Sequence, residues 1–373
     1  MVRTAGLIAA AWCLIGGTSR VACAAAGHKV VPVDDDQKQN NSKIREILRN
    51  GAFETDEAKT MFGDYYKRFV LPRWTLPELR GSLVEERKRL QDDLRLAGRA
   101  EKPPAAHDEL VALLLKCLTV FAKDNYDPAV RVNAMLMIGE LNTQEGRPPV
   151  PLVEALPVLV AALKDPQQLD AVRVAALVGL ERHCAAASQS GADLQAAGQA
   201  LAEIVGTPGK AAPPAGDAWI RKRAAEALGK LKSAGPGGAN AKALQAMVLD
   251  KTLHLSHRCA AAEALGELDF SRARLDLGPM VQALGRLAAE VLTAELDGGP
   301  SRQRLRTQLG QIVHAAKALG DLVKDEGQAA IVQVLIDAEK EVLEPLDKTD
   351  ADGDGLTGKV RDLLNKLPAA LRK

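Results

Sequence analysis

Three aspartates near the C-terminus have the spacing of a cation-binding loop. Asp350, Asp352 and Asp354 alternate with small residues in the run DADGDG. Alternating carboxylates around a glycine can present several oxygens to one Ca²⁺ ion, as in an EF-hand loop. That loop also needs a bidentate glutamate at its twelfth position, where this chain has Arg361. The sequence leaves calcium binding as one interpretation and favours an acidic, glycine-rich connector.

A second group of potential ligands, His254, His257 and Cys259, lies at the start of an Ala-rich segment. Its spacing matches no established zinc template. We therefore interpret it as a solvated turn followed by a core cysteine, with metal binding as the minor alternative. The sequence also lacks the nucleophile elbow, the zinc-protease helix motif, the phosphate-binding loop and the dinucleotide-binding glycine motif. It predicts a protein that is not an enzyme and has no cofactor other than the candidate Ca²⁺.

The first 26 residues have the composition of a secretory signal peptide. Arg3 precedes the apolar run LIAAAWCLIGG, and small residues follow between Ala22 and Ala26. Because this run is too short to span a bilayer comfortably, we predict cleavage near residue 26 and no transmembrane span in the mature chain. The chain is then exported to the periplasm or cell envelope. Lipidation at Cys23 and an uncleaved membrane anchor are the alternatives.

Three cysteines follow the predicted signal peptide: Cys117, Cys184 and Cys259. Each lies in a helical stretch rich in Ala and Leu, and their number is odd. Widely spaced, unpaired cysteines of this kind behave as small apolar core residues. We therefore predict no disulfide framework, in spite of the predicted export.

The composition points to helices that pack closely. Hydrophobic residues make up 47% of the 373 residues, while aromatic residues make up only 3%. Ala and Leu therefore supply the apolar content, and both residues favour helices. The net charge is +1, from 49 basic and 48 acidic residues without a basic stripe, which argues against nucleic acid as a partner. A chain of this length forms several domains or a repeat array.

An internal repeat decides between those two possibilities. Arg131, Arg173, Arg221 and Arg258 each precede a large aliphatic residue by seven positions, and they are separated by 42, 48 and 37 residues. An aspartate stands shortly before three of them, at the expected start of a helix where its carboxylate can cap free amide groups. These aspartates are Asp127, Asp170 and Asp217. The spacing predicts helix pairs that bury their apolar faces by stacking on adjacent pairs.

This pattern resembles the HEAT-repeat family, whose second helices typically open with Asp, Val and Arg. The resemblance implies an all-α fold, an α-solenoid of stacked antiparallel helix pairs. It also implies a polar ladder that links successive repeats, formed by Asp127, Arg131, Asp170, Arg173, Asp217, Arg221 and Arg258. The fourth copy lacks the aspartate, which argues against a ladder contact at Arg258.

The pattern divides the chain into segments. After the signal peptide we expect a disordered linker over residues 27–41 and an N-terminal helical cap over residues 42–100. The repeat array follows over residues 108–325, and a C-terminal helical cap with the acidic loop covers residues 326–373. Aromatic residues gather between Phe62 and Trp74. They predict packing of the cap on the first repeat, with an aromatic binding platform as the alternative.

A solenoid without a recognisable catalytic constellation predicts an interaction scaffold for a protein partner that the sequence does not identify. Two alternatives stay open. The chain could be an accessory enzyme subunit, or a lyase-like HEAT protein that uses an unrecognised groove. It could also be a calcium-responsive protein of the envelope with weak affinity for the ion.

Overall fold

The repeat helices form between residues that cap them. Asp127 accepts from the amide of Ala129 at 2.9 Å and starts α6 (Pro128–Glu140), whose first position is a proline. Asp325 and Ser301 cap α15 (Glu326–Ala338) and α14 (Arg302–Gly320) in the same way. These side chains satisfy amide groups that have no partner within the helix. Capping therefore places the helix starts close to where the sequence predicts them.

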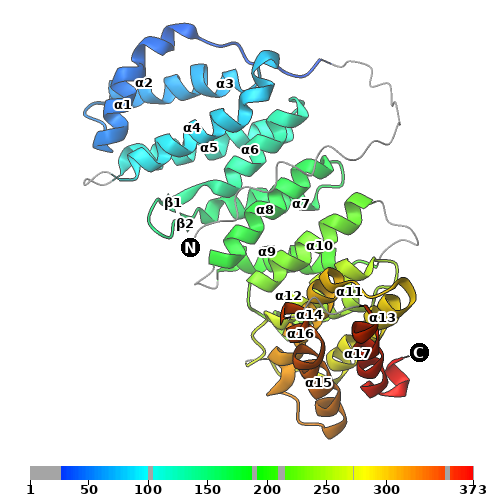
Figure 1. The fold of residues 1–373 in the computed structure, drawn as a ribbon. Coiled ribbons are helices and arrows are strands. Elements are labelled where there is room, and N and C mark those ends of the chain that lie inside the picture. The colour runs from blue at the N-terminus through cyan, green and yellow to red at the C-terminus, as the bar shows by residue number, and fades with distance from the viewer. Residues whose placement is uncertain are drawn as a thin grey trace.

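A computed structural model describes residues 27–99, 104–186, 191–208, 215–271, 273–348 and 353–372. In this part of the chain helices dominate and pack in sequence order, so the fold is an all-α solenoid (Figure 1). The N-terminal segment holds η2 (Asp35–Asn40), α1 (Asn41–Asn50), α2 (Asp56–Asp64), η3 (Tyr65–Val70), α3 (Leu71–Arg73), η4 (Pro77–Ser82) and α4 (Leu83–Ala97).

Antiparallel helix pairs follow. The first helices of the pairs are α5 (Ala105–Lys123), α7 (Leu156–Lys164), α9 (Ala192–Gly206), α11 (Ala239–Leu249) and α13 (Gly278–Gly298). The second helices are α6, α8 (Asp170–Ala186), α10 (Ala215–Lys230), α12 (Leu255–Gly266) and α14. Short helical turns η5 (Val153–Ala155) and η6 (Pro236–Gly238) precede α7 and α11, and the chain ends with α15, η7 (Glu339–Leu343), α16 (Glu344–Lys348), α17 (Gly353–Lys366) and η8 (Ala369–Leu371).

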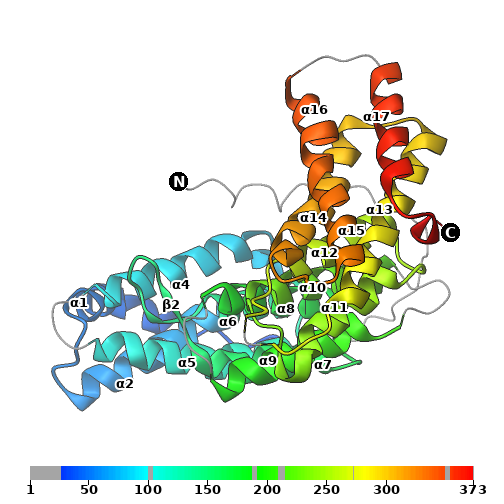
Figure 2. The same cartoon turned by 90° about the horizontal axis from the view of Figure 1, so that it is seen from below.

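The second helices form one layer, which we call the inner layer (α6, α8, α10, α12 and α14). Each of them except α14, the last, packs against the second helix of the next pair. In Figure 2 the first helices lie on the other side of this layer, and α14 to α17 rise from its end on the inner side. The array is therefore curved, with the inner layer on the concave side.

Glycines bring the inner helices into backbone contact. A Cβ atom on Gly139 would lie 2.6 Å from the Cα of Gly179. A Cβ atom on Gly266 would lie 2.7 Å from the Cα of Ala315. The distance between packed helices depends on the side chains at the contact, so these small residues reduce the distance between neighbouring helices of the inner layer. This closer spacing in the inner layer accounts for the direction in which the array curves.

The N-terminal segment has a different core, built from aromatic rings. Phe62 and Tyr66 pack edge to face with ring centroids 5.0 Å apart. Trp74 is fully buried, and the Tyr66 hydroxyl donates to Asp93 at 2.9 Å. Burial is the largest influence on Asp93 and raises its pKa, in opposition to the nearby Arg45. These aromatic residues are core residues, not an exposed platform.

The segment before the first helix differs from its predicted disorder. Residues 27–34 are extended, and the amide of Lys29 donates to the carbonyl of Asn125 at 2.8 Å. The amides of Val31 and Asp34 donate to Thr75 and Arg68, both at 2.9 Å. The prediction of a disordered linker over residues 27–41 is wrong, because this segment finds hydrogen-bond acceptors on the cap and on the first repeat.

A short hairpin interrupts the array between the first and second pairs. Its strands, β1 (Asn142–Gln144) and β2 (Val150–Pro151), pair antiparallel between α6 and η5. The sequence has no strand signal here, because the hairpin is held by contacts with other elements and not by alternating apolar residues.

Among the described helices, none is both long and apolar enough to cross a membrane. The predicted signal peptide, residues 1–26, lies outside the described residues.

Candidate functional site

The four repeated arginines, which we call the ladder arginines (Arg131, Arg173, Arg221 and Arg258), occupy equivalent places in the second helices. Each donates to a backbone carbonyl near the end of the first helix of its own pair. The last carbonyls of a helix have no partner within that helix, so these bonds satisfy groups that would otherwise be unpaired. The acceptors are Ala122 at 3.3 Å, Leu163 at 3.3 Å, Val205 at 3.1 Å and Val248 at 2.7 Å, in chain order.

Three of the ladder arginines also reach the following repeat. Arg221 donates to Asp250 at 2.7 Å, and Arg258 donates to Glu290 at 2.5 Å. Arg131 donates to Gln168. Burial pulls the pKa of Glu290 upward, but Arg258 outweighs it and the pKa is lowered. These bonds tie the first, third and fourth pairs to the pair that follows each of them.

Asp127 and Asp170 have partners other than a ladder arginine of a neighbouring repeat. Asp127 caps α6 and pairs with Arg80 at 2.9 Å. Asp170 pairs with Arg173 of its own helix at 3.3 Å, and Asp217 lies in the first turn of α10. The acceptors described above come from turns or first helices of the next pair. An aspartate at a helix start is already engaged by its own helix, which leaves the inter-repeat acceptor to other residues.

The fourth copy shows the consequence. Its missing aspartate argued against a ladder contact at Arg258, but the contact is present. Arg258 is only 3% exposed and makes both bonds of the ladder. The sequence analysis missed Asp250 and Glu290 as partners. Asp250, the partner of Arg221, could have been found from the sequence, since it is an acidic residue in the turn eight positions before the next ladder arginine, Arg258.

A second row of polar contacts crosses the surface of the inner layer. Lys230 of α10 pairs with Glu267, the residue that follows α12, at 2.7 Å, and Gln311 of α14 donates to Glu263 of α12 at 2.7 Å. Arg223 of α10 pairs with Glu181 of α8. Paired polar side chains therefore connect α8, α10, α12 and α14 across this surface.

Trp219 stands out on this surface. It lies near the start of α10, is 41% exposed, and has the Arg223 guanidinium 5.8 Å from its ring centroid. Arg223 and Glu226 follow it at helical spacing on the same face. The corresponding residues of the first two repeats are Ala129 and Ala171, so comparison of the copies could have singled out Trp219.

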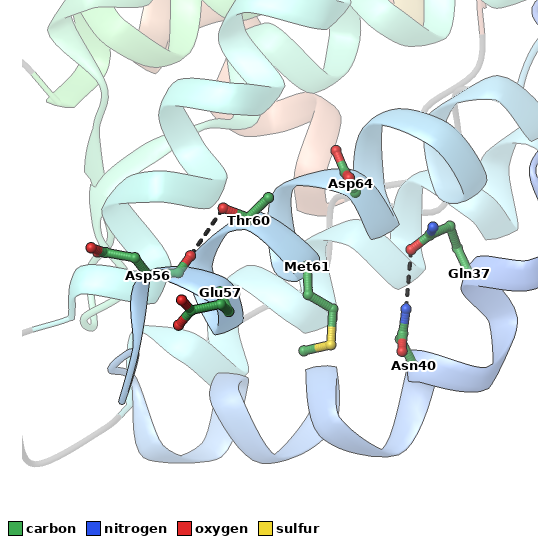
Figure 3. A pocket seen from close by; sticks show the side chains of 7 residues that line it. All are labelled: Gln37, Asn40, Asp56, Glu57, Thr60, Met61 and Asp64. Atoms are coloured by element: carbon green, nitrogen blue, oxygen red, sulfur yellow. Dashed lines mark hydrogen bonds between the residues drawn. The ribbon is translucent and has the colours of Figure 1, made fainter.

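The described surface has hollows, of which two differ in size and lining. The larger, of about 970 Å³, lies between α9 and α11 and is lined mostly by small and apolar residues. Its one acidic residue, Glu203, pairs with Lys164 at 2.7 Å. The smaller, of about 420 Å³, is shown in Figure 3, where Asp56 and Gln37 lie at opposite ends. Neither hollow brings together an acid, a base and a nucleophile.

The residues with metal-binding potential are dispersed. His254 caps α12 and accepts through Nδ1 from the amide of Ser256 at 3.2 Å, while Cys259 is fully buried. Asp350 and Asp352 lie outside the described residues, and Asp354 lies in the first turn of α17. Within the described ranges, no group of three or more His, Cys, Asp or Glu residues could hold a metal ion.

The buried titratable groups belong to the core. Burial, reinforced by Arg182, lowers the pKa of His183 to about 4. Burial also raises the pKa of Cys184 and Cys259 to about 12. The three described cysteines form no disulfide. A thiol with so high a pKa is a poor nucleophile at neutral pH.

No family model matches the chain, and a search of curated proteins finds no significant match. The geometry alone therefore defines the class, which is an all-α solenoid with a curved inner layer.

Proposed function

We propose that this chain is an exported, HEAT-like scaffold that binds a protein partner on its inner layer. The observation that carries the proposal is Trp219, a large aromatic residue exposed on the concave side of a solenoid. Concave solenoid surfaces commonly receive extended partners. In the part of the chain that is described, this surface is present, and candidate catalytic residues are not assembled into a group.

The chemistry around Trp219 favours a protein over other partners. Trp and Arg are the residues that most often dominate protein interfaces, and here Arg223 lies against the Trp219 ring. The surrounding charges are paired, as Lys230 is with Glu267, so the surface lacks the uncompensated positive charge that nucleic acid requires. A partner segment with an apolar anchor and mixed polar flanks fits this surface.

Affinity capture from the native envelope fraction tests the proposal. Residues 27–373 would serve as bait, together with the variants Trp219→Ala and Leu249→Ala. Leu249 is 38% exposed at the end of α11 and so provides a matched control on the opposite layer. We expect a stoichiometric protein that Leu249→Ala retains and that Trp219→Ala binds about tenfold more weakly, the loss of one central anchor.

Other outcomes would contradict the scaffold. Equal recovery by both variants would remove the inner layer as the binding surface. A small molecule retained by the purified chain would support the alternative of an accessory enzyme subunit. Heat released on titration with Ca²⁺, and lost after Asp352→Asn, would support the calcium-responsive alternative.

A further inference from the structure

A buried acid and a buried histidine meet where the hairpin contacts the first repeat. His107 lies near the start of α5 and is 1% exposed. Its Nε2 is 3.6 Å from the Oε1 of Glu145, which follows β1 and has a side chain only 6% exposed. This separation is too long for a hydrogen bond but short enough for an ion pair.

The surroundings leave Glu145 few other partners. Asn142 donates to Glu145 Oε1 at 3.0 Å. The end of α4 closes over the side chain, since a Cβ atom on Gly98 would lie 2.8 Å from Glu145 Cγ. Among the described residues, His107 is the one cation within ion-pair distance of this carboxylate.

The other charged groups around the pair are engaged elsewhere. Asp108 of α5 lies 3.4 Å from His107 Nδ1 but is 73% exposed. Arg95 of α4 pairs with Asp92 at 3.1 Å. Arg182 of α8 donates to the carbonyl of Gly139 at 2.9 Å and also to Asn142. A neutral His107 would therefore leave the Glu145 charge buried without a counter-ion, which is costly.

The hairpin links the first two repeats and contacts the cap through Gly98. We infer that the His107–Glu145 ion pair is a pH-sensitive latch, which holds the hairpin against the N-terminal helices while His107 is protonated and releases it when His107 loses its proton. This inference does not depend on the proposed scaffold function.

The direction of the pH effect follows from both groups. Burial opposes the charged form of His107, but Glu145 and Asp108 outweigh it and raise the pKa above 6.5. The stabilisation is thus complete below pH 6.5 and is lost as the pH rises through the raised value. Burial likewise opposes the charged form of Glu145, but His107 and Asn142 lower the pKa below 4.5. Acid therefore breaks the latch only below that pH.

Hydrogen exchange on the full chain tests the latch. The amide of Leu152 donates to the Leu141 carbonyl at 3.0 Å at the base of the hairpin and serves as a reporter. After correction for intrinsic exchange, we expect its protection to fall about tenfold between about pH 6 and about pH 8.5, because local opening then costs less. The variant Glu145→Gln should remove this dependence.

A control and a second measurement make the test decisive. His314→Gln, at an exposed position of α14, should keep the wild-type dependence. The His107 imidazole, followed by NMR, should titrate above 6.5 in the wild type and lower in Glu145→Gln. Protection that is equal at both pH values, or a His107 pKa at or below 6.5, would overturn the inference even if the variant folds poorly.

Discussion

The N-terminal cap and the repeat array solve the same packing problem in opposite ways. The cap fills its core with large rings such as Trp74, Tyr66 and Phe62, which are fully buried. The array instead brings backbones together at glycines such as Gly139 and Gly179. A terminal segment packs against the array on one side only, so large side chains can fill its core. An internal repeat has to match two neighbours, which close contact between small residues achieves.

The difference also sets how each region tolerates change. A large residue that is shortened leaves a cavity, whereas a small residue that is enlarged forces two backbones apart. We therefore expect truncation to harm the cap most and enlargement to harm the array most.

Trp74→Ala should have the largest effect, about 4 kcal/mol of unfolding free energy, because it empties a fully buried site in the cap. Chemical denaturation followed by circular dichroism would measure it. Val84→Ala, at a position 58% exposed on α4, is the control and should change little. A small loss for Trp74→Ala would mean that the cap does not contribute to global stability.

Acid should weaken the array through His183. Its pKa of about 4 lies below the ordinary 6.5, so the unfolded state binds the proton more tightly. Stability should therefore fall as the pH drops from 6.5 toward 4, by about 3 kcal/mol in total. His183→Leu should flatten this part of the profile of melting temperature against pH. An unchanged slope in the variant would show that other groups carry the acid effect.

Gly139→Ala should destabilise the array by about 2 kcal/mol, since the new methyl group meets the Gly179 backbone. The variant should also open the curvature, which small-angle scattering would detect as a larger radius of gyration. Gly298→Ala is the matched control, because nothing lies within 4 Å of its added Cβ. Equal effects of the two substitutions would refute backbone contact as the cause of the curvature.

The ladder arginines should differ among themselves. Arg258 has a side chain only 4% exposed, so Arg258→Ala should cost about 2 kcal/mol. The substitution leaves the Val248 carbonyl without this donor and leaves Glu290 with only the more distant Lys251, at 3.6 Å. Arg173 bonds to Leu163 and to Asp170, a partner that is 63% exposed, so Arg173→Ala should cost about 1 kcal/mol or less. Thermal unfolding of both variants checks the order. A greater loss of stability for Arg173→Ala than for Arg258→Ala would contradict the partners described for these two arginines.

Trp219→Ala should have the smallest effect on stability, within about 0.5 kcal/mol, because the side chain is 41% exposed. The same melting measurement applies. A large loss would mean that Trp219 supports the fold, and the reduced partner capture expected of this variant would then have a structural explanation.

Much of the architecture was predictable because it depends on local patterns. The start of α6 next to Asp127 follows from helix capping. The recurrence of the ladder arginines indicated the pairing of helices, which the solenoid fold confirms.

The rest depends on contacts that no local pattern reports. Residues 27–34 are ordered by acceptors at Arg68, Thr75 and Asn125, which are distant in sequence. The hairpin depends in the same way on Arg182 of α8. The side-chain acceptors of Arg131, Arg221 and Arg258 come from the next repeat, so they could be found only once the stacking of the pairs was known.

In the inner helices, different positions determine the spacing between helices and the side chains exposed on the surface. On α10, Gly229 faces the neighbouring helix and sets the spacing, whereas Trp219 faces outward. The radius of the concave surface and the chemistry displayed on it can therefore vary independently. An engineer could replace the outward residues to recruit a new ligand while leaving the scaffold geometry unchanged.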